Sequence, residues 1–84
     1  ELVVIALIRI ATSEPDVAAK LLTSKWTPYL TIEERNWVWG AIGRQSAMRL
    51  EDDALSHFGK VTKEQDLNDD MLGWKARALL MRGE

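Results

Sequence analysis

Three features of the sequence predict an all-α fold of about five helices. No segment alternates apolar and polar residues in the way that a half-buried strand requires. Apolar residues recur instead at helical spacing, and proline, glycine and acidic residues stand where helices begin and end. We therefore expect antiparallel helical hairpins stacked as a superhelical, TPR-like (tetratricopeptide-like) array, with a compact irregular bundle as the alternative.

The first helix is expected over residues 2–11, which are apolar at nine of ten positions and are interrupted only by Arg9. Ten residues are too few to span a bilayer, and the cationic start and small-residue cleavage site of a signal peptide are missing. We interpret this segment as a buried helix that stops near Thr12 and whose outer neighbour belongs to a longer protein.

A second helix is expected over residues 14–25. Ser13 can cap its start, and Pro15 is favoured in a first helical turn. Pro28 predicts a break over residues 26–30, because proline pushes the residue before it out of the helical region.

The third helix is expected from Thr31 to about Arg49 and opens with a clear local signal. Thr31 and Glu34 have the spacing of a capping box, in which each side chain satisfies a free backbone N–H group. Trp37 and Trp39 lie about 200° apart around a helix, so they point in nearly opposite directions. A helix that is apolar on both sides is expected to lie between two layers of neighbours.

This two-sided pattern divides the third helix between its neighbours. We expect Trp39 and Ile42 to face one layer and Trp37 and Ala41 to face the other. A chain of 84 residues buries only about 60–65% of its unfolded surface, so each of these layers is important for stability.

Two further helices are expected. Residues 51–53 place three acids at the start of the fourth helix, where negative charge is favoured. Its apolar positions form a single stripe at helical spacing: Ala54, Leu55, Phe58 and Val61. Residues 62–66 are polar and predict a loop, and the fifth helix is expected from near Asn68 to Gly83.

A weak internal sequence repeat supports the array. A shift of 33 positions aligns residues 43–44 with 76–77 and residues 48–49 with 81–82. Helical hairpin repeats have periods of about 33–47 residues, and each unit buries its apolar faces by stacking on the next.

Charge and composition exclude several classes of function. The chain has 11 basic and 13 acidic residues and a net charge of −2, so no general attraction to nucleic acid or to an anionic membrane is expected. Cysteine is absent, which excludes disulfides, thiolate metal ligands and thiol nucleophiles. His57, the single histidine, has only Asp53 as a carboxylate at helical spacing, and a metal site needs more ligands. We interpret His57 as an exposed or half-buried structural residue and predict no catalytic, cofactor-binding or metal-binding residue.

Other polar and aromatic residues receive structural interpretations. The helix macrodipole accounts for the acids in first helical turns: Glu33, Glu34, Asp69 and Asp70. Four arginines could line a groove for an anionic or sugar ligand, but we interpret them as covering helix ends and apolar surface: Arg44, Arg49, Arg77 and Arg82. The tryptophans could stack on sugar rings, but their helical spacing favours a place in the core. Close approach of neighbouring helices explains the glycines at Gly40, Gly43, Gly59 and Gly73.

Two segments carry a more specific signal: ERNWVWGAIGRQSAMRLEDDALSHFGKV at residues 34–61 and LNDDMLGWKARALLMRGE at residues 67–84. Their distinctive points are the Glu-Arg-x-Trp-x-Trp start, the Gly-Arg-Gln run and the Trp-Lys-Ala-Arg run. Over these segments the chain resembles the superhelical region of the soluble lytic murein transglycosylases. The resemblance implies a ring of α-helical hairpins in the periplasm of Gram-negative bacteria. In that family a separate lysozyme-like domain cleaves the bond between N-acetylmuramic acid and N-acetylglucosamine without water, forms a 1,6-anhydro product, and uses one glutamate as acid and base.

The chain departs from the family at the catalytic motifs. In the family a serine follows the catalytic glutamate and a Gly-Leu-Met-Gln stretch lies downstream, and this sequence contains neither. No catalytic residue can be transferred, so residues 1–84 are expected to be a fragment of the α-superhelical domain that is inactive by itself, within a parent enzyme that acts on peptidoglycan.

This expectation defines the partners of the segment. It would pack on the remaining repeats and the catalytic domain, contact the glycan strand through the parent protein, or associate with itself across a two-fold axis that covers Leu2, Ile5 and Ile8 from water. The alternative is an independent helical-repeat module that binds a peptide or protein partner in its concave groove. A third possibility, a carbohydrate-active enzyme complete in this segment, is disfavoured because the catalytic motifs are missing.

Overall fold

The computed structural model describes residues 2–81, with the side chain of Leu2 left aside. Within this range the chain forms five α-helices and no strand, which confirms the all-α prediction. The helices are α1 (Leu2–Ser13), α2 (Pro15–Leu21), α3 (Ile32–Met48), α4 (Ala54–Phe58) and α5 (Asp69–Met81). Their connections contain a π-helical turn, Leu22–Trp26, and two 3₁₀ turns, Thr27–Tyr29 and Glu64–Asp66.

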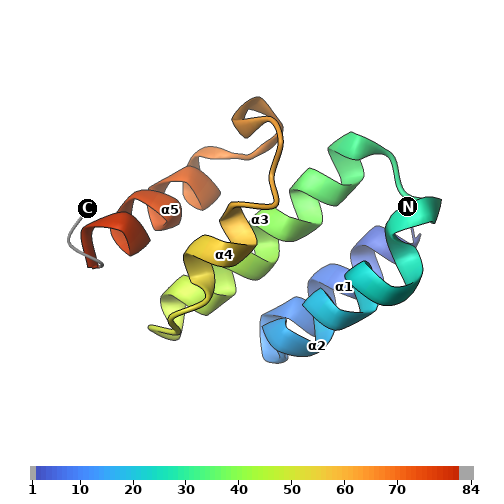
Figure 1. Cartoon of the computed structure of the whole chain (residues 1–84), viewed down its shortest axis with the longest axis horizontal. Coiled ribbons are helices and arrows are strands. Elements are labelled where there is room, and N and C mark those ends of the chain that lie inside the picture. Colours follow the sequence, from blue (N-terminus) through green and yellow to red (C-terminus); the bar gives the residue numbers. More distant parts are fainter. Residues whose placement is uncertain (1, 82–84) are drawn as a thin grey trace.

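Consecutive helices run in alternating directions, and α3 lies in the middle of the molecule (Figure 1). Helices α1 and α2 pack on one side of α3, and α4 and α5 pack on the other. The described residues therefore contain two helical hairpins and one further helix. Their stacking into a TPR-like superhelix stays a prediction.

The boundary between α1 and α2 follows the prediction in one respect and corrects it in another. Pro15 occupies the first turn of α2, as expected. Ser13 is not the cap, because it ends α1, and Glu14 takes the N-cap position without a side-chain hydrogen bond. The guanidinium of Arg49 donates to the Ser13 carbonyl, so a cation stabilises the C-terminal end of α1.

The connection between α2 and α3 lies where the break over residues 26–30 was predicted, with a 3₁₀ turn at Thr27–Tyr29, but the reason given at Pro28 is wrong. Thr27, the residue before it, keeps helical angles (φ −50°, ψ −47°). The backbone N–H of Thr27 donates to the Leu22 carbonyl and closes the π-helical turn. The Thr27 hydroxyl donates to the same carbonyl at 2.6 Å and helps to hold Thr27 in the helical region. The chain becomes extended only at Leu30 (φ −115°, ψ 147°).

Both ends of α3 are capped. The backbone N–H of Glu34 donates to the Thr31 hydroxyl oxygen at 3.1 Å, and the N–H of Thr31 donates to the Glu34 carboxylate at 2.9 Å, which confirms the capping box. At the other end Leu50 adopts a left-handed conformation (φ 59°). The N–H groups of Leu50 and Glu51 donate back to carbonyls of the last helical turn in a Schellman motif, at whose left-handed position glycine is favoured.

The two faces of α3 are buried in different cores, as predicted. The first core joins α3 to α1, α2 and the π-helical turn: Leu7, Ala11, Ala18, Leu22, Leu30, Val38, Trp39 and Ile42. The second core joins α3 to α4, α5 and the loop between them: Ala41, Phe58, Leu67 and Met71. Trp37 packs against the second core, so the assignment of Trp39 and Ile42 to one layer and of Trp37 and Ala41 to the other is confirmed.

Helix α4 is shorter than predicted. It ends at Phe58, and Gly59 is its C-cap residue rather than an interior one. Ala54 and Phe58 are buried, whereas Val61 lies in the following turn, half-buried, and packs against both cores.

Helix α5 starts as predicted, because the Asn68 side-chain oxygen accepts a hydrogen bond from the Met71 N–H at 2.8 Å. Asp69 and Asp70 lie in its first turn. The expected helix end at Gly83 lies outside the described residues.

Two glycines of α3 permit the close approach that was predicted. A Cβ atom on Gly43 would lie 2.9 Å from the Phe58 ring, and one on Gly40 would lie 2.5 Å from Leu67 Cδ2. The explanation is wrong for Gly73, since nothing lies within 4 Å of the same position there.

Candidate functional site

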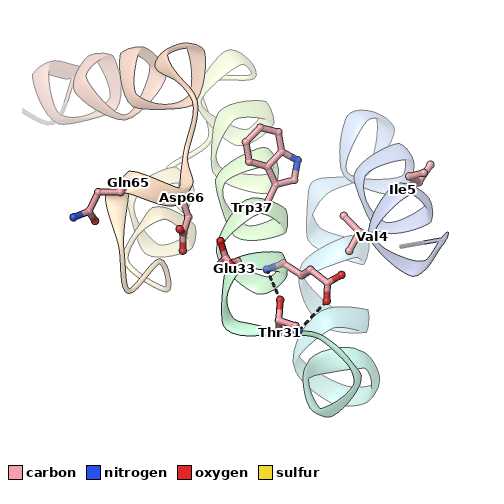
Figure 2. Close-up of a pocket in the computed structure, with 8 residues that line it drawn as sticks. Val4, Ile5, Thr31, Glu33, Trp37, Gln65 and Asp66 are labelled. Carbon is pink, nitrogen blue, oxygen red and sulfur yellow. Dashed lines mark hydrogen bonds between the residues drawn. The ribbon is translucent and has the colours of Figure 1, made fainter.

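A groove of about 570 Å³ opens between α1, the start of α3 and the 3₁₀ turn Glu64–Asp66 (Figure 2). Figure 2 shows Val4 and Trp37 on facing helices, with Asp66 on the far side of Trp37. The groove is lined by Val4, Ile5, Thr31, Glu33, Glu34, Trp37, Gln65 and Asp66. It combines one indole ring and two aliphatic side chains with several oxygen-bearing groups.

Part of this polar lining is already used by the fold. Thr31 and Glu34 form the capping box, and Asp66 Oδ2 accepts a hydrogen bond from the Asn36 side-chain amide at 2.8 Å. In the described part of the chain, the Glu33 carboxylate and the Gln65 amide make no hydrogen bond or ion pair. These two groups and the Trp37 ring are therefore the parts of the groove that are suited to contact a ligand.

Asn36 fixes the loop that forms one wall of the groove. Its side chain is only 2% exposed, and besides Asp66 it donates to the Thr62 hydroxyl at 3.2 Å. Its oxygen accepts from the Thr62 backbone N–H at 3.0 Å. Sequence reasoning missed this residue, although a polar amide beside Trp37 and Val38 on a helix that is buried on both sides was a usable signal.

His57 departs from its interpretation as an exposed or half-buried residue, because it is buried, with 9% of its surface exposed. Its ring stacks on that of Trp39, with centroids 5.8 Å apart and planes inclined by 19°. Its Nε2 atom lies 3.3 Å from Asp53 Oδ2. Asp16 of α2, which no spacing in the sequence connects with α4, lies beside this pair. Stacking on the Trp39 ring helps to remove the histidine from solvent.

The arginines weighed as groove residues have other partners. Arg44 pairs with Asp70, and Arg77 lies over the Trp74 ring, 4.8 Å from its centroid. Arg49 holds the end of α1, as described above, and Arg82 lies outside the described residues. The three described arginines thus have structural contacts, and none of them lines the groove of Figure 2.

Among the described residues, no helix combines the length and the apolar character that crossing a bilayer requires. Comparison of the chain with protein-family models, with curated proteins and with solved structures found no match.

Proposed function

We propose that this chain is a non-catalytic helical scaffold segment of a periplasmic lytic transglycosylase that acts on peptidoglycan. The resemblance over residues 34–61 and 67–84 supports the family, and the alternating helical hairpins agree with the architecture which that resemblance implies. In this role the segment helps to hold or orient a glycan strand, while a separate domain of the parent protein cleaves the bond.

The two-sided burial of α3 is the observation that carries the scaffold role. Val38 and Ile42 are fully buried in the first core, and Ala41 packs with Phe58 in the second. A helix that is packed in this way joins one hairpin to the next, as helices of stacked repeats do.

The groove supplies a surface for the glycan. The Trp37 ring offers an apolar face, and the Glu33 carboxylate and Gln65 amide offer acceptors and donors for sugar hydroxyls. The groove is open and lies along the start of α3. It therefore suits an extended ligand better than a compact ligand that a closed cavity would surround.

The first test measures cleavage. The purified chain should release no 1,6-anhydro-muropeptides from peptidoglycan sacculi, because glycosidic cleavage needs a positioned acid and base. Release of this product, with loss of the release in Glu33→Gln or Glu34→Gln, would overturn the non-catalytic assignment.

The second test measures binding by co-sedimentation with sacculi. Trp37→Leu and Glu33→Gln should weaken retention, whereas Tyr29→Leu, which removes an aromatic ring that is 73% exposed and lies outside the groove, should not. Equal retention of all variants would refute the glycan-contacting groove. Binding of a basic peptide instead, lost in the same two variants, would favour the alternative of an independent helical-repeat module.

A further inference from the structure

One side-chain cluster away from the groove has the composition of a metal site. Asp53 is the N-cap residue of α4, His57 lies one turn later on the same helix, and Asp16 lies in the first turn of α2. One ligand atom from each of the three side chains lies within 4.8 Å of the other two. The cluster thus draws on two different helical hairpins.

Two buried atoms of this cluster have no hydrogen-bond partner. They are His57 Nε2 and Asp53 Oδ1, both shielded from solvent. His57 Nε2 lies 3.3 Å from Asp53 Oδ2, but the two atoms do not form a hydrogen bond. A buried polar atom without a partner destabilises the fold, so these two atoms call for a compensating ligand.

We propose that Asp16, Asp53 and His57 form a binding site for a divalent transition-metal ion of the Zn²⁺ type. Two ligands on a tetrahedral zinc ion, with bonds of about 2.0–2.1 Å, are separated by about 3.3 Å. The His57 Nε2 to Asp53 Oδ2 distance of 3.3 Å fits this separation. Asp16 is exposed, so its carboxylate is able to rotate toward the other two, and water completes the coordination.

The ligand types select the ion. An imidazole nitrogen suits zinc and its neighbours in the periodic table, whereas Mg²⁺ and Ca²⁺ prefer oxygen ligands alone. The stacking of Trp39 on His57 fixes the plane of the imidazole ring, so the ligand is oriented before the ion binds. Because Asp16 belongs to the α1/α2 hairpin and the other two ligands to the α3/α4 hairpin, the ion would hold the hairpins together.

The test uses the untagged chain, stripped with a chelator and titrated with ZnCl₂. His57 is the only histidine, so its imidazole NMR signals report on this site alone. We expect one Zn²⁺ per chain, a shift of these signals and a rise in the melting temperature, with no such response to MgCl₂.

Matched variants separate the site from adventitious binding. Removal of a residue that only hydrogen-bonds a metal ligand weakens metal affinity about 10- to 100-fold. Asp16→Asn alters a ligand itself, so it should weaken Zn²⁺ binding at least about tenfold. Asp16 is exposed, so this variant should fold, and His57→Gln provides a second measurement. Asp52→Asn removes an exposed carboxylate next to the site and should leave binding unchanged. Failure to bind Zn²⁺, or equal affinity of wild type and Asp16→Asn, would overturn the proposal.

Discussion

On its α1/α2 side, α3 presents large side chains to its neighbours, whereas on its α4/α5 side it presents, apart from Trp37, mainly small residues. Val38, Trp39 and Ile42 project from α3 into the first core. On the other side, Gly40 and Gly43 let side chains of the later elements approach the α3 backbone itself. On the first side, side chains of α3 therefore pack between the neighbouring helices. On the second side, side chains of the neighbouring elements pack against the α3 backbone.

The difference shows which changes each side tolerates. Truncation is expected to harm the first side, because it leaves a cavity where α3 fills its neighbour. Added atoms are expected to harm the second side, because Phe58, 1% exposed, has no room to move away from Gly43. The second side is also fixed by a polar anchor, since Asn36 binds Thr62 and Asp66 across the interface.

The largest effect is expected for Trp39→Ala. Trp39 is 8% exposed, belongs to the first core and stacks on His57, so its truncation should cost about 3–5 kcal/mol of unfolding free energy. That loss is large for a small domain, whose total stability is about 5–15 kcal/mol. Urea unfolding followed by circular dichroism measures it, with the exposed Tyr29→Ala as the control. A soluble Trp39→Ala variant with unchanged melting would show that the ring is not part of the core.

Asn36→Ala tests the anchor on the second side. The change leaves the Thr62 N–H and the Asp66 carboxylate without this partner, and should lower the unfolding free energy by about 1–3 kcal/mol. Gln45→Ala is the control on the same helix, because the half-buried Gln45 side chain makes no hydrogen bond within residues 2–81. Equal losses in the two variants would mean that the polar contacts contribute nothing specific.

A pair of glycine variants separates close packing from helix propensity. Alanine is favoured over glycine in a helix by about 1 kcal/mol, so Gly73→Ala, which meets no neighbour, should stabilise the chain by about 0.5–1 kcal/mol. Gly43→Ala places a methyl group against the Phe58 ring and should instead destabilise it by about 1–2 kcal/mol. Both are measured by chemical unfolding, and effects of the same sign would remove the asymmetry between the two sides of α3.

The features that the sequence predicted are local or periodic. The capping box at Thr31 and Glu34 depends on residues three positions apart, and the two-sided burial of α3 follows from helical geometry applied to Trp37 and Trp39. The rule for the residue before proline is also local, but it was wrong at Pro28 because a hydroxyl hydrogen bond held the preceding residue helical.

The features that the sequence did not predict depend on residues far apart in the chain. Asn36 meets partners 26 and 30 positions away, and Asp16 reaches His57 from another hairpin. No spacing rule brings such residues together, because their distance depends on how helices cross. The groove was missed for the same reason, since its walls come from α1, α3 and the turn before α5.

The smallest effect on stability is expected at the exposed surface of α1, which belongs to neither of the two cores. Ile5 is 51% exposed, whereas Leu7 is buried in the first core. A two-fold contact between α1 helices was expected to cover Leu2, Ile5 and Ile8, and this is corrected for Ile8, which is half-buried and packs against both cores. The Leu2 side chain lies outside the described part of the chain. Ile5, which also lines the groove of Figure 2, therefore remains as an exposed apolar residue of α1 for association between chains.

Ile5→Glu should change the unfolding free energy by less than about 0.5 kcal/mol, because the side chain is at the surface. It should nevertheless weaken self-association in sedimentation runs over a concentration series, since a charge would be placed in the contact between two copies of α1. Ile8→Glu is the contrasting variant and should destabilise the chain strongly, because it would place a charge on a half-buried side chain that packs against both cores. A wild-type chain that is monomeric at every concentration and binds no apolar dye would show that the outer face of α1 is not a contact surface between copies.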